Sequence, residues 1–171
     1  ADDVIGTLAR EAAAAGMQVE ISTGDKDFAQ LVDPQVRLVN TMSNSVTDAA
    51  GVMEKFGVRP EQIADFLALT GDSVDNIPGV DKCGPKTAAK WLAEYGTLEN
   101  LIANADAIGG KIGENLRAAI PHLPLSRQLA TIRLDVEVPA AADDLRQREP
   151  DREALRALYT RYEFNAALAD L

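Results

Sequence analysis

The chain has 171 residues, 46% of them hydrophobic, and a mean hydropathy of −0.12, which is enough apolar content to bury a sizeable core. No apolar run approaches the roughly 20 residues that cross a bilayer, so we expect a cytoplasmic protein without a membrane partner. The single cysteine, Cys83, and the single histidine, His122, exclude a disulfide framework and argue against a zinc site. The net charge of −10 argues against a protein that coats DNA nonspecifically, because such binding depends on lysines and arginines that displace counterions.

The first 46 residues have the pattern of an α/β protein. An alanine-rich segment predicts a helix from Asp2 to about Ala15, with acids at its head, where the helix dipole favours negative charge. A strand at 18–23, a short helix at 27–31 and a second strand at 36–40 follow, and a loop or hairpin is expected to about residue 46.

The remainder of the chain is mainly helical. Apolar residues at helical spacing, with Pro60, Pro85 and Thr97 at or near helix starts, predict helices at 47–56, 61–70, 85–95, 97–105, 111–119 and 125–132. A last amphipathic helix from Asp151 to Tyr159 is expected to pack its apolar side chains on the core.

Aspartates recur in pairs near the ends of apolar elements. Any one pair is typical of a helix cap, but three pairs within 75 residues favour a metal site. Carboxylate oxygens suit Mg²⁺ or Mn²⁺, and two such ions about 3.5 to 4 Å apart can clamp the attacking and leaving oxygens of a phosphodiester. The predicted catalytic and metal-binding residues are Asp2, Asp3, Asp25, Asp27, Asp72 and Asp75.

The segment from Gly79 to Lys90 predicts a phosphate-binding hairpin. Pro85 suits the first position of a helix, and Gly84 before it can take backbone angles closed to other residues. The free amides at such a helix start can receive a phosphate oxygen, while Lys86 and Lys90 share one helix face and can follow one strand without reading bases. The predicted DNA-binding residues are Gly79, Val80, Lys82, Gly84, Lys86, Thr87 and Lys90.

Together these motifs resemble the 5′ nuclease domain of bacterial DNA polymerase I, which is related to flap endonucleases. The resemblance rests on Ala-Asp-Asp-Val-Ile-Gly-Thr-Leu-Ala at the start, Ser-Thr-Gly-Asp-Lys-Asp-Phe-Ala-Gln-Leu at 22–31 and Leu-Ala-Leu-Thr-Gly-Asp-Ser-Val-Asp-Asn-Ile-Pro-Gly-Val at 67–80. It extends through Gly-Pro-Lys-Thr-Ala at 84–88 and Tyr-Glu-Phe at 162–164, and so covers essentially the whole chain.

The resemblance implies an α/β fold with a partial 5′-nuclease (PIN-like) sheet, followed by a mainly helical region with a helix-hairpin-helix motif. It places the C-terminal part of the nuclease core at 1–70, the DNA-binding region at 71–135, and a tail and helix that pack on the core at 136–171. It also implies metal-dependent cleavage of single strands or flaps at 5′ ends, on DNA or RNA primers, in bacterial replication and repair. All six aspartates match family metal-site carboxylates.

The resemblance further implies that the hairpin from Gly79 to Gly84 grips duplex DNA and holds K⁺ through backbone carbonyls. The family's domain begins with an upstream segment that carries further aspartates and a helical arch, and it is followed by a polymerase region. Because neither is in this sequence, we expect the isolated polypeptide to be catalytically deficient.

Four residues near the hairpin have predictions of their own. We expect Lys111 and Arg117 to extend its basic face. Cys83 stands where relatives commonly carry a small residue or a glycine, which makes its thiol a candidate for oxidation. His122 is expected to be a loop or packing residue.

Two other interpretations stay open. A noncatalytic helix-hairpin-helix module would use the hairpin to bind duplex DNA and the aspartates as caps, so its DNA binding would be indifferent to Asp25 and Asp72. A purely structural α/β protein would use the hairpin as a packing turn and would show no salt-dependent DNA binding.

Overall fold

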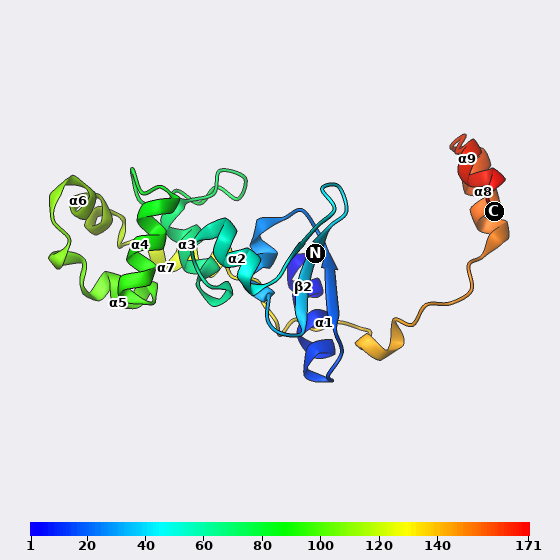
Figure 1. Ribbon diagram of the computed structural model, residues 1–171, viewed down its shortest axis with the longest axis horizontal. Coiled ribbons are helices and arrows are strands. Elements are labelled where there is room, and N and C mark those ends of the chain that lie inside the picture. Colours follow the sequence, from blue (N-terminus) through cyan, green and yellow to red (C-terminus); the bar gives the residue numbers. More distant parts are fainter.

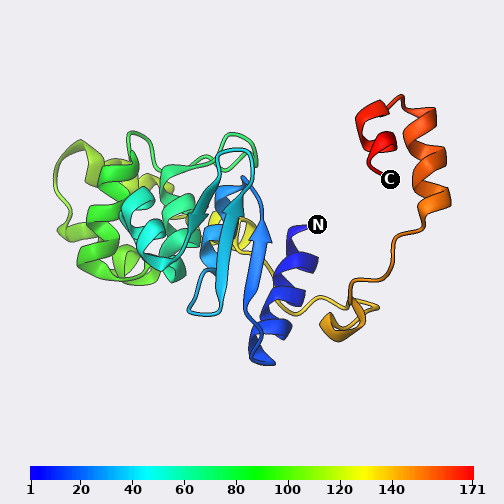
Figure 2. The ribbon, with the colours of Figure 1, turned by 45° about the vertical axis from the view of Figure 1, so that its right-hand side comes forward.

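The computed structural model describes residues 1–171. Figure 1 shows an elongated molecule with a small sheet and its helix in the middle, a helical body at one end, and two C-terminal helices that stand apart at the other. The turned view in Figure 2 shows the same three parts. None of the helices has the length and hydropathy that a membrane span needs.

The sheet has three strands in the order β1-β2-β3. Strand β1 (Val19–Ser22) pairs in parallel with β2 (Val36–Asn40), which pairs antiparallel with β3 (Ser45–Thr47). Ile21 and Leu38 are register partners, and both are buried, so these strands turn an apolar face to the core. The short strand β3 completes the hairpin that was one of the two alternatives expected up to about residue 46.

Two elements lie next to the sheet, and one of them joins it to the helical body. Helix α1 (Asp2–Ala14) contacts β1, and the 3₁₀ turn η1 (Lys26–Leu31) contacts α1, β2 and the helix α3 (Ile63–Thr70) of the helical body. One hydrophobic cluster runs from Ala9 in α1 to Ile132, after the last helix of the body. The sheet and the helical body therefore share a single core.

The helical body is built around α3 (Ile63–Thr70), which packs against α4 and α7 and has fully buried Ile63 and Leu69. The predicted helices are present, with bounds that differ by a few residues. The other elements are α2 (Ala49–Phe56), η2 (Pro60–Gln62), α4 (Pro85–Tyr95), α5 (Leu98–Ala103), η3 (Ala105–Ala107), α6 (Gly110–Ala119) and α7 (Leu123–Ala130).

A buried carboxylate, Asp65, ties three of these helices together. It lies on α3, accepts a hydrogen bond of 2.9 Å from the backbone N–H of Leu98 at the start of α5, and pairs with Arg127 Nε of α7 at 2.6 Å. Burial raises the pKa of Asp65, and the Leu98 amide and the Arg127 charge oppose that rise. Asp65 therefore has a structural role in holding α3, α5 and α7 together.

The C-terminal tail corrects one prediction. Beyond the turn η4 (Ala142–Asp144), α8 (Arg152–Arg161) forms about where expected, but it packs against α9 (Asn165–Ala169) and stands apart from the core in both views (Figures 1 and 2). Leu158 remains 46% exposed. The prediction that this helix packs on the core is wrong, because an amphipathic pattern predicts an apolar stripe without naming its partner. The domain bounds themselves stay a prediction.

Candidate metal centre and nucleic-acid interface

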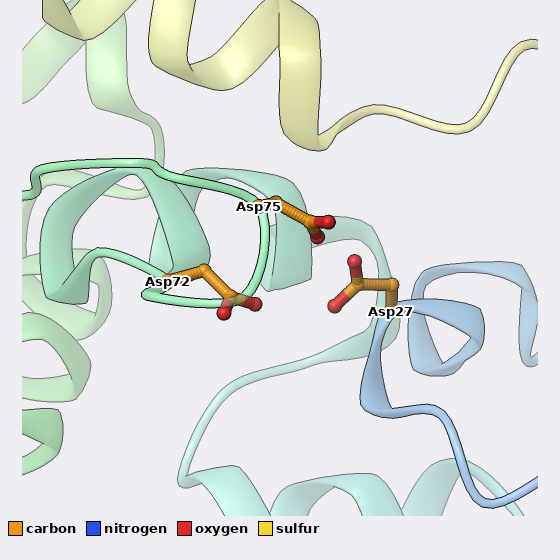
Figure 3. A group of neighbouring side chains, drawn as sticks. All are labelled: Asp27, Asp72 and Asp75. Carbon is orange, nitrogen blue, oxygen red and sulfur yellow. The ribbon is translucent and has the colours of Figure 1, made fainter.

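Three of the paired aspartates meet in space: Asp27, Asp72 and Asp75. One carboxylate oxygen from each lies within 4.8 Å of the others. Figure 3 shows Asp27 pointing from η1 toward Asp72 and Asp75, which lie on the loop after α3. We call these three residues the acidic cluster.

The backbone fixes two of these side chains on one small loop. Asp72 N–H donates to the Ile77 carbonyl at 2.8 Å, and Ile77 N–H donates back to the Asp72 carbonyl at 2.7 Å. Within the loop, Asp72 Oδ1 accepts from Val74 N–H at 2.9 Å, which fixes one of its two carboxylate oxygens. Asp75 therefore comes to the cluster through local hydrogen bonds, whereas Asp27 comes through packing of η1 against α3.

Lys26 supplies the positive charge next to this cluster. Its ammonium donates a hydrogen bond to Asp72 Oδ2 and lies 3.5 Å from Asp27 Oδ1. The hydrogen bond from Lys26, helped by that from Val74, lowers the pKa of Asp72 against the effect of burial. Burial lowers the pKa of Lys26, but the hydrogen bond to Asp72 and the nearby carboxylates outweigh it, so the pKa is raised.

The pKa of Asp27 is shifted in the direction opposite to that of Asp72. Burial raises its pKa from 3.8 to about 6, the charge of Lys26 opposes the rise, and the negative charges of Asp25, Asp72 and Asp75 add to it. Asp27 Oδ1 is buried and has no hydrogen-bond partner. A buried oxygen that accepts no hydrogen bond, on a carboxylate that faces two further carboxylates, is an arrangement that a hard divalent cation satisfies. The residues of the acidic cluster therefore fit a hard divalent cation.

The other predicted metal ligands lie outside this cluster. Asp2 is exposed and Asp3 is half-buried in the first turn of α1, and Asp3 Oδ1 accepts a hydrogen bond from Arg133 N–H at 2.9 Å. Asp25 Oδ1 caps η1 by accepting from Asp27 N–H at 3.0 Å, which helps to orient Asp27. The assignment of Asp2, Asp3 and Asp25 as metal ligands stays a prediction.

The hairpin that follows the acidic loop depends on Gly79. Its φ of +68° is strained for other residues, and a Cβ there would lie 2.5 Å from the backbone nitrogen of Gly71. Val80 is buried and donates its N–H to the Leu69 carbonyl at 2.8 Å, which ties the hairpin to the end of α3. His122 Nε2 lies 3.1 Å from the Gly79 carbonyl, so this histidine also supports the hairpin.

At Gly84 the structure corrects the sequence-based reason for a glycine. Its φ of −84° and ψ of 175° are open to other residues, so the expected special backbone angles are absent. An added Cβ would meet nothing within 4 Å. Gly84 instead leaves open space in front of α4, where no side chain caps the first turn.

Beside this helix start lies a cleft of about 730 Å³ between α4 and the start of α6, which we call the lysine cleft. Four lysines and no carboxylate line it, in a chain whose net charge is −10. The sequence predicted the lysines and Thr87 of this lining. It did not predict Asn115 or the apolar lining residues, because their place in the cleft depends on how α4 and α6 meet. The lining residues are Lys82, Lys86, Thr87, Lys90, Trp91, Ile108, Gly109, Lys111, Ile112 and Asn115.

Two predictions near the cleft are wrong. Arg117 does not extend the basic face, because its guanidinium donates to the carbonyls of Ala105 at 2.7 Å and Ile108 at 3.1 Å. Cys83 is only 5% exposed, and burial raises its pKa to about 11. Since the thiolate is the reactive form, Cys83 is not a favourable oxidation target. Lys111, in contrast, lines the cleft as expected.

The chain matches two family descriptions, which together cover residues 1–153. Residues 1–57 match the 5′-3′ exonuclease N-terminal resolvase-like domain, and residues 58–153 match the 5′-3′ exonuclease C-terminal SAM fold. The first match covers the α/β segment of this chain and the second covers the helical body, so both segments match 5′-3′ exonuclease domains. The chain belongs to the 5′-3′ exonuclease family.

Its curated relatives include bacterial DNA polymerases I. DNA polymerase I of Pseudomonas aeruginosa is 54% identical over 100% of the chain, which corresponds to 20% of that protein. The thermostable DNA polymerase I of Thermus aquaticus is 44% identical over 98% of the chain and 20% of its own length. The chain spans about a fifth of the length of these relatives.

Solved structures confirm the fold class. The T5 D15 protein, co-crystallised with metal ions, has a TM-score of 0.69 and 24% identity over 78% of this chain and 50% of its own. The catalytic core of Rad2, in complex with DNA substrate, has a TM-score of 0.55 and 18% identity over 90% of this chain and 55% of its own. The predicted combination of a partial α/β sheet and a mainly helical region is therefore confirmed.

Proposed function

We propose that this chain forms the ion-binding and duplex-gripping part of a 5′ nuclease that hydrolyses phosphodiesters at 5′ ends or flaps. The observation that carries the proposal is the convergence of Asp27, Asp72 and Asp75, in which the Asp27 carboxylate faces the other two and its Oδ1 is buried without a hydrogen bond. Membership of the exonuclease family supports hydrolysis of nucleic acid as the reaction.

The acidic cluster would hold Mg²⁺ or Mn²⁺, and Asp2, Asp3 and Asp25 are the proposed further ligands. A bound ion supplies a polarised phosphoryl oxygen and an activated water in such sites. The chain's own part is to orient the carboxylates: the loop closed between Asp72 and Ile77 fixes two of them, and the Asp25 cap orients the third.

The lysine cleft is the proposed grip on the duplex. Four lysines without a carboxylate favour contact with the sugar-phosphate backbone, so binding should be independent of base sequence and weakened by salt. The open space at Gly84 lets a phosphate approach the uncapped start of α4. The other proposed DNA contacts are backbone groups of Gly79 and Val80 and the hydroxyl of Thr87. We also propose that the carbonyls of the hairpin hold K⁺.

The proposed partner is duplex DNA with a 5′ flap or 5′ end, including an RNA primer. We place the chain within a longer bacterial DNA polymerase I, where an upstream nuclease segment and a polymerase region act on the same DNA in the cytoplasm, at the nucleoid. Relatives about five times as long support this setting.

The test measures binding and cleavage of a labelled 5′-flap duplex by the chain, in Mn²⁺ and in EDTA. We expect Mn²⁺ to tighten flap binding, because an ion held by the cluster gains a phosphate oxygen as a ligand, and Asp72→Asn to abolish the tightening. Flap binding that is equal in Mn²⁺ and EDTA, and indifferent to Asp72→Asn, would instead favour a noncatalytic duplex-binding module.

A further inference from the structure

The position of Lys26 is unusual because it brings a cation to the carboxylates that would hold an ion. Its ammonium hydrogen-bonds Asp72 and lies 3.5 Å from Asp27 Oδ1. The side chains of Asp72 and Asp27 are only 5% and 13% exposed, whereas that of Lys26 is 39% exposed. The Lys26 ammonium is therefore held by two largely buried carboxylates, while part of the lysine side chain is open to solvent.

Charge balance explains why the cluster has a lysine. Three carboxylates within 4.8 Å repel one another, and burial strengthens the repulsion. Asp27 and Asp72 each have an ion pair within 4 Å, and in both cases the partner is Lys26. An ammonium and a divalent cation would thus neutralise the same negative charge, and carboxylate oxygens can bind either of them.

We propose that Lys26 is a counter-cation that competes with the divalent ion for Asp72, and that it leaves this carboxylate when the ion binds. This inference rests on the proposed function, because it takes the acidic cluster as ion-binding. The flexible four-carbon stem and its exposure give the ammonium a path to solvent. Lys26 would hold the carboxylates together without an ion and would keep ion binding weak enough for exchange.

If Lys26 positioned the carboxylates instead of competing with the ion, its removal would change the Mn²⁺ affinity in the opposite direction. A lysine that only positions the carboxylates stays on Asp72 when the ion binds, and its removal then weakens ion binding. A lysine that competes must be displaced, so its removal strengthens ion binding. The direction of the change in Mn²⁺ affinity therefore distinguishes competition from positioning.

The experiment is calorimetric titration of Mn²⁺ into the 171-residue chain and into Lys26→Met, with thermal unfolding of both in EDTA. We expect Lys26→Met to bind Mn²⁺ about tenfold more tightly, since a like charge is removed from the ion's position, and to melt at a lower temperature in EDTA. Lys26→Gln, which can keep a hydrogen bond to Asp72 without the charge, should also bind Mn²⁺ more tightly and serves if Lys26→Met does not fold.

Arg156→Met is the matched control, because Arg156 is exposed on α8, lies outside both the acidic cluster and the lysine cleft, and carries the same unit charge. It should leave the Mn²⁺ affinity unchanged. Equal or weaker Mn²⁺ binding by Lys26→Met and Lys26→Gln overturns the competition while leaving the proposed ion site in place. No Mn²⁺ binding by the wild-type chain overturns the ion site itself, and the competition with it.

Discussion

The acidic cluster and the lysine cleft use opposite charges and are built in different ways. The cluster brings together carboxylates 45 residues apart in sequence, two of them largely buried, and they share one lysine. Three of the four lysines of the cleft come from the hairpin and α4, and the fourth comes from α6. Substitutions within the cluster should therefore influence one another, whereas those in the cleft should add.

The two regions nevertheless share one support, the end of α3. The loop with Asp72 and Asp75 begins there, and the hairpin returns to it through Val80 and the Leu69 carbonyl. Figure 1 shows α3 between the sheet and α4. Damage to this support should disturb both regions, while changes of charge should disturb only one.

The largest effect is expected from Gly79→Ala. The new Cβ would clash with the backbone at Thr70 and Gly71, and φ would be strained, so we expect a loss of about 3 kcal/mol or more in the free energy of unfolding. Chemical denaturation measures it. Gly84→Ala is the matched control on the same hairpin and should change stability by less than about 1 kcal/mol. Equal losses from the two variants would contradict the shared support.

The next effect concerns the cleft alone. Lys86→Glu combined with Lys90→Glu should weaken duplex binding by about 30- to 100-fold at low salt and lower the salt slope by about 2, because two phosphate contacts are lost. Fluorescence anisotropy over a salt series measures both quantities. Arg156→Glu, on exposed α8, is the matched single charge reversal outside the cleft and should leave binding nearly unchanged. A loss of duplex affinity of similar size in that control would show that the overall charge of the chain, and not a site in the cleft, determines binding.

The smallest effect is a pH dependence at Asp27. Its pKa rises from 3.8 to about 6 on folding, so the folded state binds this proton more tightly than the unfolded chain does. That contribution to stability is fully present below about pH 4 and is lost as the pH rises through about 6. In EDTA, Asp27→Asn should therefore gain stability relative to wild type between these pH values, by about 1 to 3 kcal/mol.

Thermal unfolding at about pH 4 and about pH 7 checks this sign. Asp106→Asn, the same substitution at an exposed position, is the matched control. A relative stability of Asp27→Asn that falls with rising pH would mean that Asp27 is stabilised as a carboxylate in the folded chain, against the burial that raises its pKa.

Periodicity and caps were enough to predict most elements of this fold. The helix of α4 follows from Pro85 and its apolar rhythm, and the sheet from two short β-branched runs. The candidate site was only half predictable. Repeated aspartates indicated a metal site, but that Asp27 and not Asp25 meets Asp72 depends on how η1 packs against α3.

Other features required the tertiary structure for the same reason. Lys26 was visible between Asp25 and Asp27, but its contact with Asp72 joins residues 46 positions apart. Arg117 carries the same charge as the cleft lysines, yet carbonyls of its own neighbourhood take up its donors. The stripe on α8 predicted a helix correctly and its packing partner wrongly, since amphipathicity says nothing of distance.

The most direct test of two separate sites is Mn²⁺ titration of three proteins without DNA: wild type, Asp72→Asn, and the double variant Lys86→Glu with Lys90→Glu. We expect wild type and the lysine variant to bind Mn²⁺ equally, and Asp72→Asn to bind it about 100-fold more weakly, because a charged ligand is lost from a largely buried position. Equal Mn²⁺ binding by wild type and Asp72→Asn, or no binding by wild type, would contradict the assignment of the acidic cluster as the ion site.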